Sequence, residues 1–196
     1  MGEMTTRDRI VEAADQLFYQ RGFEHTSFAD IADAVRISRG NFYYHFKSKD
    51  EILDAVIALR FANTKKMLAQ WEVDGGDPAG RIRCFIKILI TNQAKIKLYG
   101  CPVGTLSSEL AKLGHAAQAD ANELFTLFHR WLKGQFVALG CEADAGDLAM
   151  HLLARSQGAA TLFNAFQDEA FVQKEVDQMC GWLDSVTKAG TSSKNE

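Results

Sequence analysis

The sequence predicts an all-α protein. Apolar residues recur at three- and four-residue spacing along almost all of the 196 residues, which is the period of an amphipathic helix. Only two prolines interrupt the chain, and 47% of its residues are hydrophobic, which is ample for a buried core. Breaks in the pattern predict about nine helices. They divide into a three-helix domain over residues 1–50, a larger helical domain over residues 51–190 and a disordered tail over residues 191–196.

Capping residues place the starts of the early helices. The first helix is expected over residues 5–21. Ser27 and Ser38 are predicted N-caps of the second and third helices, because a serine hydroxyl accepts a hydrogen bond from a free N–H of the first turn. Ser48 and Glu51 have the spacing of a capping box, which opens the fourth. The remaining helices are expected over residues 49–71, 78–98, 102–114, 116–139, 145–167 and 169–188.

Charge and motif content narrow the function. The net charge is −3, and residues 1–50 carry seven Lys or Arg against eight Asp or Glu, so any DNA-binding role depends on local placement of cations. We expect a cytoplasmic protein, because no long apolar run and no signal-peptide pattern occur. The chain lacks the serine-hydrolase, zinc-protease, P-loop and dinucleotide motifs, and its five histidines share no metal spacing. We therefore expect neither an enzyme nor a cofactor or metal.

Residues 27–51 have the layout of a helix-turn-helix. Two short helical patterns flank a tight turn, and a third helical pattern begins directly after them. Residues 34–49 include four Lys or Arg and one His but no acid. A short turn followed by a cationic, aromatic second helix is typical of proteins that insert this helix in the DNA major groove.

The run SRGNFYYHFKSKDEIL, with Thr26 and the pair Ile31 and Ala32 before it, carries a family resemblance. It resembles the DNA-binding domain of the TetR family of bacterial transcriptional repressors, over roughly the first quarter of the chain. One position departs from the family pattern, because Arg36 stands where the turn usually has glycine. Either the turn holds a strained non-glycine residue, or its geometry differs slightly.

The resemblance implies that residues 38–46 enter the major groove. Arg39 is the expected base reader, since its guanidinium matches guanine O6 and N7, while Asn41 would address a base or a phosphate and Gly40 permits close approach. The tyrosines and the histidine of this helix would contact phosphates. The starts of the second and fourth helices, with Ser27 and Lys49, would hold further phosphates. The predicted DNA-binding residues are Thr26, Ser27, Ser38, Arg39, Gly40, Asn41, Tyr43, Tyr44, His45 and Lys49.

A structural interpretation competes with this one. The aromatic residues of YYHF could simply form a core stripe, with the charges on a solvated face. Phe42 and Phe46 fit that interpretation, whereas two tyrosines, a histidine and four cations fit it poorly. For Arg36 and Lys47, a phosphate contact and an idle surface charge are both compatible with the sequence.

Further expectations also come from the resemblance. The chain would be a repressor that binds a palindromic operator as a homodimer and is released by a small apolar or electrophilic effector; the alternatives are an activator and a regulator without ligand. The last two helices would pair with their symmetry mates in a four-helix bundle, helped by the small residues 158–160. The alternative is that these helices only close the core.

The larger domain is expected to enclose the effector. A surplus of aromatic residues on helix faces suggests an apolar pocket with a few polar groups, although each aromatic taken alone fits a core role better than a pocket role. Cys101 precedes a predicted helix start, where the helix dipole favours a thiolate, and a similar Gly-Cys element resembles that of family members that sense electrophiles. The predicted effector-binding residues are Trp71, Phe85, Leu89, Gln93, Cys101, Phe125, Phe128, Trp131 and Phe163.

Overall fold

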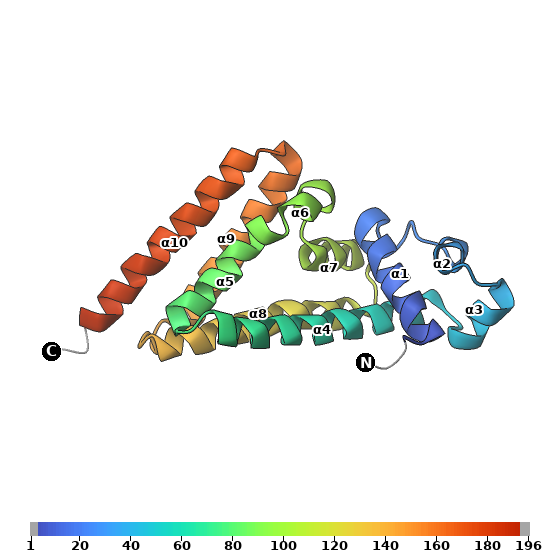
Figure 1. The fold of residues 1–196 in the computed structure, drawn as a ribbon, viewed down its shortest axis with the longest axis horizontal. Helices are drawn as coiled ribbons and strands as arrows, with labels where there is room; N and C mark the ends of the chain where they lie inside the picture. The colour runs from blue at the N-terminus through green and yellow to red at the C-terminus, as the bar shows by residue number, and fades with distance from the viewer. Residues whose placement is uncertain (1–3, 193–196) are drawn as a thin grey trace. The chain divides into compact units, whose positions relative to one another are not determined.

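The computed structural model describes residues 4–192, and within this range the chain forms ten α-helices and no strand (Figure 1). The all-α class is therefore confirmed. The helices are α1 (Thr6–Arg21), α2 (Phe28–Val35), α3 (Arg39–His45), α4 (Lys49–Asp74), α5 (Pro78–Thr91), α6 (Gln93–Tyr99), α7 (Pro102–Leu113), α8 (Gln118–Ala138), α9 (Ala145–Phe166) and α10 (Glu169–Ser192).

The chain divides into two compact units. The first comprises Met1–Thr64 and Pro102–Leu124, and the second comprises Lys65–Cys101 and Phe125–Glu196. The helices α4 and α8 each contribute residues to both units. Packing therefore groups α7 and the first half of α4 with α1–α3, whereas the boundary predicted after residue 50 follows the helix-turn-helix motif and stays a prediction.

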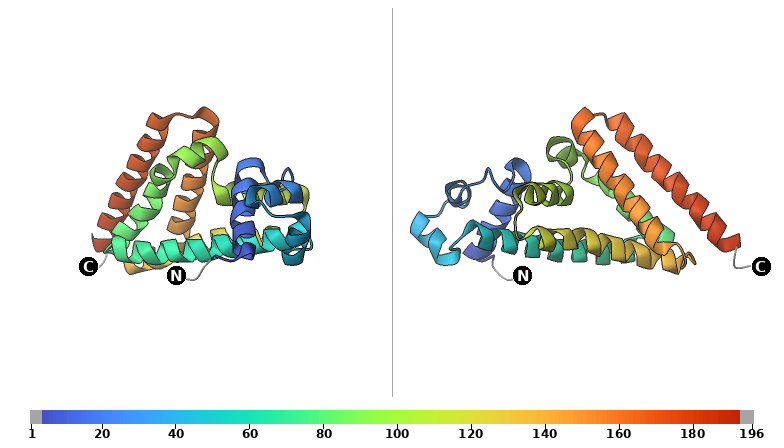
Figure 2. Two further views of the ribbon diagram at one scale, coloured as in Figure 1. Left: turned by 45° about the vertical axis from the view of Figure 1, so that its right-hand side comes forward. Right: turned by 180° about the vertical axis from the view of Figure 1, so that it is seen from behind.

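One continuous apolar core holds the first unit together. Ile10, Ile31 and Phe42 are at most 1% exposed and come from α1, α2 and α3 in turn. Leu106 and Leu110 of α7 belong to the same core, and Figures 1 and 2 show α7 next to α1. Each such side chain stabilises the fold by about 1.5–3 kcal/mol relative to its exposed state. Helix α1 thus packs on α2 of the helix-turn-helix and also on α7, which follows the motif by some fifty residues.

The second unit is built on α5, α6, α9 and α10. Helix α10 packs along α5 and α9, and α6 packs on α9 (Figure 1). Arg155 of α9 donates to the Glu175 carboxylate of α10 at 3.1 Å, and Asn164 Nδ2 donates to the carbonyls of Ile96 and Lys97 at 3.2 and 3.0 Å. These polar contacts fix the pairing of helices whose apolar faces alone would tolerate sliding.

The one additional helix arises at Asn92. The sequence predicts a single helix over residues 78–98, but Asn92 has φ −105° and ψ 13°, and it ends α5 and begins α6. An asparagine side chain competes for local backbone hydrogen bonds and so disfavours a helix interior. Ile90 and Ile96 continue the apolar pattern across the break, which is why spacing alone does not detect it.

Most helix limits lie within three residues of those predicted. Helix α10 continues to Ser192, so it includes the first two residues of the predicted tail, and residues 193–196 lie outside the described range. No helix within residues 4–192 is both long and apolar enough to cross a membrane.

Candidate DNA-binding interface

Serine caps start both helices of the motif, as predicted. The Ser27 hydroxyl accepts from the Asp30 N–H at 3.2 Å, and the Asp30 carboxylate accepts from the Ser27 N–H at 2.8 Å, which completes a capping box. Hydrogen bonds from the Ser27 side chain and backbone hold the pKa of the Asp30 carboxyl below its ordinary value. The Ser38 hydroxyl accepts from the Asn41 N–H at 3.3 Å and begins α3.

The turn between the two helices holds a residue in the left-handed conformation. Arg36 has φ 60° and ψ 49°, so the first of the two alternatives for this position is correct. Its N–H donates to the Asp33 carbonyl, and the Ile37 N–H donates to the Ala32 carbonyl, each at 3.1 Å. These two bonds form a Schellman motif, which closes α2 and redirects the chain into α3.

Helix α3 has one buried face and one exposed face. Phe42 and the following Phe46 are 1% and 0% exposed, as the core interpretation of these two residues predicts. The opposite face is open to solvent, and a Cβ added at Gly40 would meet nothing within 4 Å. The exposed residues of the helix are Arg39, Gly40, Asn41, Tyr43 and Tyr44. The polar residues predicted to contact DNA therefore share a face that the protein's own core does not use.

The two tyrosines of α3 lie in different environments. The Tyr43 ring packs edge-on against Phe28 and Phe42, with centroids 5.6 and 6.3 Å apart, while 47% of the residue stays exposed. Tyr44 is 78% exposed and meets the half-buried His45 ring at 5.2 Å. Packing thus fixes the direction of the Tyr43 hydroxyl. This agrees with the expectation that Tyr43 packs against the helix as well as facing the DNA.

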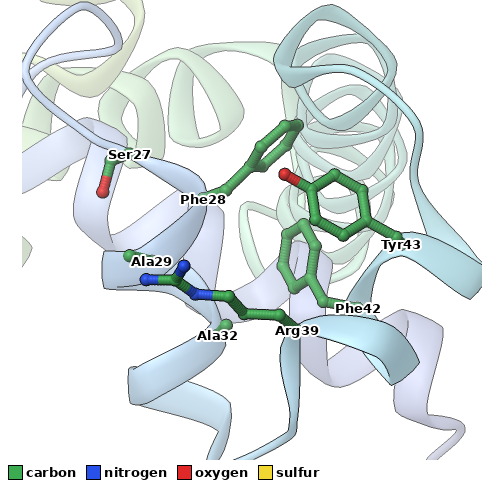
Figure 3. Close-up of a pocket in the computed structure, with 7 residues that line it drawn as sticks. All are labelled: Ser27, Phe28, Ala29, Ala32, Arg39, Phe42 and Tyr43. Carbon is green, nitrogen blue, oxygen red and sulfur yellow. The ribbon is translucent and has the colours of Figure 1, made fainter.

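A hollow of about 300 Å³ lies between α2 and α3 (Figure 3). In Figure 3 the Arg39 side chain extends toward Ala29 on one side, and the rings of Phe28 and Tyr43 stand on the other. Within residues 4–192, the Arg39 guanidinium has no hydrogen bond or ion pair. The hollow is lined by Ser27, Phe28, Ala29, Ala32, Arg39, Phe42 and Tyr43.

The contribution of α2 to this hollow was not anticipated from the sequence. Ala29 and Ala32 are one turn apart on α2, and their short side chains leave the space into which Arg39 extends. The sequence signal for this hollow is the pair Ala29 and Ala32, two small residues one helical turn apart in the helix that precedes the basic one.

Two predicted phosphate contacts have structural roles instead. Thr26 is 1% exposed, and its hydroxyl donates to the Gly22 carbonyl at 2.7 Å. The Lys49 ammonium donates to the carbonyls of Phe23 and Glu24 at 3.1 and 3.3 Å and lies 4.3 Å from the centre of the Phe23 ring. Both side chains hold the α1–α2 loop, since the Thr26 hydroxyl hydrogen and two of the three Lys49 N–H groups are bonded to its carbonyls, and a phosphate contact by either residue stays a prediction.

The N-termini of α2 and α4 already carry carboxylates. Asp30 occupies the first turn of α2, and Glu51 occupies that of α4, where its carboxylate accepts from the Lys47 N–H at 2.7 Å. The Ser48 hydroxyl accepts from the Glu51 N–H at 3.1 Å, so the predicted capping pair forms, with its reciprocal bond one residue earlier than in a standard box. The Lys47 ammonium donates to the Tyr43 carbonyl, which places this cation at the end of α3.

Four of the predicted effector-binding aromatics come together in the second unit. The Trp71 ring lies 6.4 Å from Phe85 and 5.7 Å from Trp131, and Phe85 lies 5.7 Å from Phe128. Trp131 also donates its indole N–H to Glu72 at 3.1 Å. The described ring contacts do not extend to Phe125 or Phe163. Leu89 and Phe163 are 2% and 0% exposed, and Gln93, Cys101 and Phe125 are half-buried.

None of the four cysteines forms a disulfide, and burial raises the pKa of the Cys180 thiol. Among residues 4–192, no three His, Cys, Asp or Glu side chains are grouped to hold a metal ion.

Known proteins resemble this chain along most of its length. Residues 10–56 match the family model for bacterial regulatory proteins of the TetR family, and residues 78–178 match that for the C-terminal domain of LmrA/YxaF-like transcriptional regulators. An uncharacterized HTH-type transcriptional regulator in the lacX 3' region of Lactococcus lactis subsp. lactis is 30% identical over 176 residues, which are 88% of this chain and 90% of that protein.

Two further relatives are also transcriptional regulators. The HTH-type transcriptional repressor DhaR of Mycobacterium sp. (strain GP1) is 27% identical over 134 residues, 68% of this chain and 65% of DhaR. The crystal structure of a TetR transcriptional regulator from Legionella pneumophila superposes with a TM-score of 0.80 at 26% identity, covering 94% of this chain and 98% of that one. These relatives are transcriptional regulators and not enzymes. Together with the helix-turn-helix and its exposed basic helix, the matches establish that the chain belongs to the TetR family of DNA-binding bacterial transcriptional regulators.

Proposed function

We propose that this chain is a repressor that binds a palindromic operator as a homodimer and is released by a small apolar or electrophilic effector. The observation that carries the proposal is the exposed face of α3, where Arg39 extends without an acidic partner among the described residues. An activator, or a regulator that binds DNA without an effector, is the alternative.

The exposed residues of α3 divide the work of DNA recognition. Arg39 reads a guanine through its two parallel N–H donors, and Asn41 pairs with a neighbouring base or phosphate. The Tyr43 hydroxyl lines the hollow and binds the phosphate backbone, as does that of the highly exposed Tyr44, whereas the Ser27 hydroxyl donates to the Asp30 carboxylate. Ser38 caps α3 directly before Arg39 and so fixes the start of the helix that carries the base reader.

Selection of bound duplexes from a random pool tests this proposal. The affinity of the variant Arg39→Ala for the selected duplex is then measured. We expect a palindrome, and we expect Arg39→Ala to cost about 1–3 kcal/mol on the selected operator and to relax one position in each half-site. Arg130→Ala is the matched control, since Arg130 is an exposed arginine of α8 with no described partner. Equal affinity of wild type and Arg39→Ala for selected and random duplexes would contradict the assignment.

The dimer is proposed to form through α9 and α10. Exposed apolar or small residues follow one another at four-residue spacing along α9, which is the spacing of a helix-packing ridge. A Cβ added at Gly158, in the middle of the ridge, would meet nothing within 4 Å, so the position has room for another helix. We define the α9 ridge as Met150, Ala154, Gly158, Leu162 and Phe166.

The effector is proposed to bind in the second unit beside the chain of aromatic rings. Trp71, Phe85, Phe128 and Trp131 offer apolar surface, and Trp131 connects it to the Glu72 carboxylate. Such surroundings suit a small apolar or aromatic molecule. Binding shifts the population of the regulator toward a state that does not bind the operator, which requires a preference of a few kcal/mol for that state.

Cys101 is proposed as the attachment point of an electrophilic effector. It directly precedes Pro102, the first residue of α7, so alkylation there would add bulk at the start of this helix. N-ethylmaleimide should release wild-type protein from the operator but should leave Cys101→Ser bound. Cys180→Ser is the control, because burial raises the pKa of Cys180 and so disfavours its reactive thiolate. Equal release of wild type and Cys101→Ser would exclude the thiol mechanism.

A further inference from the structure

The α1–α2 loop, residues 22–26, is held by a side chain from far along the sequence. Glu109 of α7 accepts from the Phe23 N–H through Oε2 at 2.9 Å and from the Glu24 N–H through Oε1 at 3.0 Å. Hydrogen bonds from N–H groups to a charged acceptor contribute about 1.5–3 kcal/mol, roughly twice a neutral pair. A single carboxylate therefore fixes two successive peptide groups of the loop.

Gly22 makes this approach possible. Its φ is +91°, in the region that favours glycine, and a Cβ at this position would lie 2.8 Å from Glu109 Oε1. The glycine is therefore needed both for the backbone conformation and for the space that the carboxylate occupies.

The opposite side of the loop is anchored as well. The Lys49 ammonium donates to the carbonyls of Phe23 and Glu24, so the peptide group between these two residues is bonded at both its N–H and its C=O. The His115 ring packs edge-on against Phe23 at 5.2 Å. His115 Nδ1 accepts from the Ala117 N–H at 3.1 Å, so Nε2 carries the proton and faces the Asp50 carboxylate at 3.4 Å.

Helix α7 is itself fixed to the other helices of this unit. Arg60 of α4 is 8% exposed, and it donates from Nε to the Asp15 carboxylate at 2.5 Å and from Nη1 to the Pro102 carbonyl at 2.6 Å. The start of α7 is thus joined to α1 and α4, and its middle is joined to the loop through Glu109. Figures 1 and 2 show α7 beside α1, in agreement with these contacts.

We infer that Glu109 is a positioning residue for DNA binding. The loop that it holds leads into Ser27, the cap of α2, and Ser27 lines the hollow beside Arg39. Loss of this anchor frees the start of α2 and lowers the fraction of molecules in which α2 and α3 are correctly placed, and apparent affinity falls by that fraction. The inference rests on the DNA-binding role proposed above. Glu109 itself lies outside residues 10–56, the part that matches the family's N-terminal model, so it would act on DNA binding from outside that domain.

The direction in which operator affinity changes when Glu109 is neutralised distinguishes a positioning role from simple charge repulsion. Removing an acid from a DNA-binding unit ordinarily strengthens binding, because it reduces repulsion of the phosphates. Glu123 of α8 provides this comparison, since it is exposed, belongs to the same compact unit and has no described hydrogen bond or ion pair. We expect Glu123→Gln to bind the selected operator as tightly as wild type or slightly more tightly, and Glu109→Gln to bind it about tenfold more weakly.

The experiment measures operator affinity by fluorescence anisotropy and amide exchange by NMR on the full chain. In Glu109→Gln the amides of residues 23 and 24 should exchange faster, while those of the α1 core keep their protection, which distinguishes local release from unfolding. At saturating concentration the variant should protect the same operator bases as wild type.

Glu109→Asp keeps the charge but shortens the side chain by one methylene, which draws the carboxylate back from the two amides, so it should also weaken binding. This variant decides the outcome if Glu109→Gln does not fold. Operator affinities of Glu109→Asp and any folded Glu109→Gln equal to that of Glu123→Gln would overturn the inference. Failure of wild type itself to select a duplex would instead refute the proposed function.

Discussion

At the scale of single residues, Arg36 combines a left-handed backbone conformation with a place in the turn of the helix-turn-helix. A side chain in the left-handed region costs roughly 1–2 kcal/mol, whereas glycine avoids that cost but loses about 0.5–1 kcal/mol of backbone entropy on folding. Arg36 forms no hydrogen bond or ion pair through its side chain within the described residues. We therefore expect Arg36→Gly to raise the free energy of unfolding by about 0.5–1 kcal/mol.

Urea unfolding at fixed protein concentration measures this change as a higher midpoint with an unchanged slope. Ala34→Gly is the matched control, because residue 34 is exposed on the same helix in a helical conformation, where glycine costs about 1 kcal/mol. An Arg36→Gly protein that unfolds at or below the wild-type midpoint would show that the left-handed residue is not strained. Operator affinity of the same variant decides between a phosphate contact and an idle charge at this position.

At the scale of helices, local signals predicted most of the fold. The serine caps and the apolar periodicity depend on residues three or four apart, so they can be predicted from the sequence alone. The break at Asn92 could not be read in this way, because Ile90 and Ile96 continue the pattern on either side. The exposed face of α3 was predictable for the same reason that the helices were, since Phe42 and Phe46 identify the buried side.

The rest of the candidate interface depends on contacts between distant residues. Lys49 is a plausible phosphate ligand as one cation in a basic run, and its commitment to the carbonyls of residues 23 and 24 is visible only in three dimensions. Glu109 is 86 residues from Phe23, and no spacing rule connects them. Thr26 matches the family's motif, yet burial turns its hydroxyl toward Gly22. Sequence motifs thus identify the helices of the candidate interface more reliably than they identify which of its side chains are already bonded within the protein.

At the scale of the whole molecule, the proposed function requires two copies of the chain. One helix-turn-helix reads only a few base pairs, and a two-fold dimer spaces two recognition helices about 34–36 Å apart for one palindromic site. The α9 ridge is the apolar surface that we assign to this contact. Leu162 and Phe166 are 45% and 72% exposed in the single chain, and Arg155 already fastens α9 to α10 through Glu175. Two such helix pairs can form the four-helix bundle expected of the family.

The variant Leu162→Arg tests this assembly, because it places a charge within the apolar ridge, one turn from Gly158, and an unpaired buried charge costs several kcal/mol. We expect the dimer dissociation constant to rise by about 100-fold or more, as measured by sedimentation velocity, with the helical content unchanged. Val137→Arg is the control, since Val137 is an exposed apolar residue of α8 outside the ridge. The Leu162→Arg monomer should also bind the palindrome no more tightly than a single half-site, because it has lost the second recognition helix. If Leu162→Arg stays dimeric at the concentrations at which the wild type is dimeric, the interface does not lie on the α9 ridge.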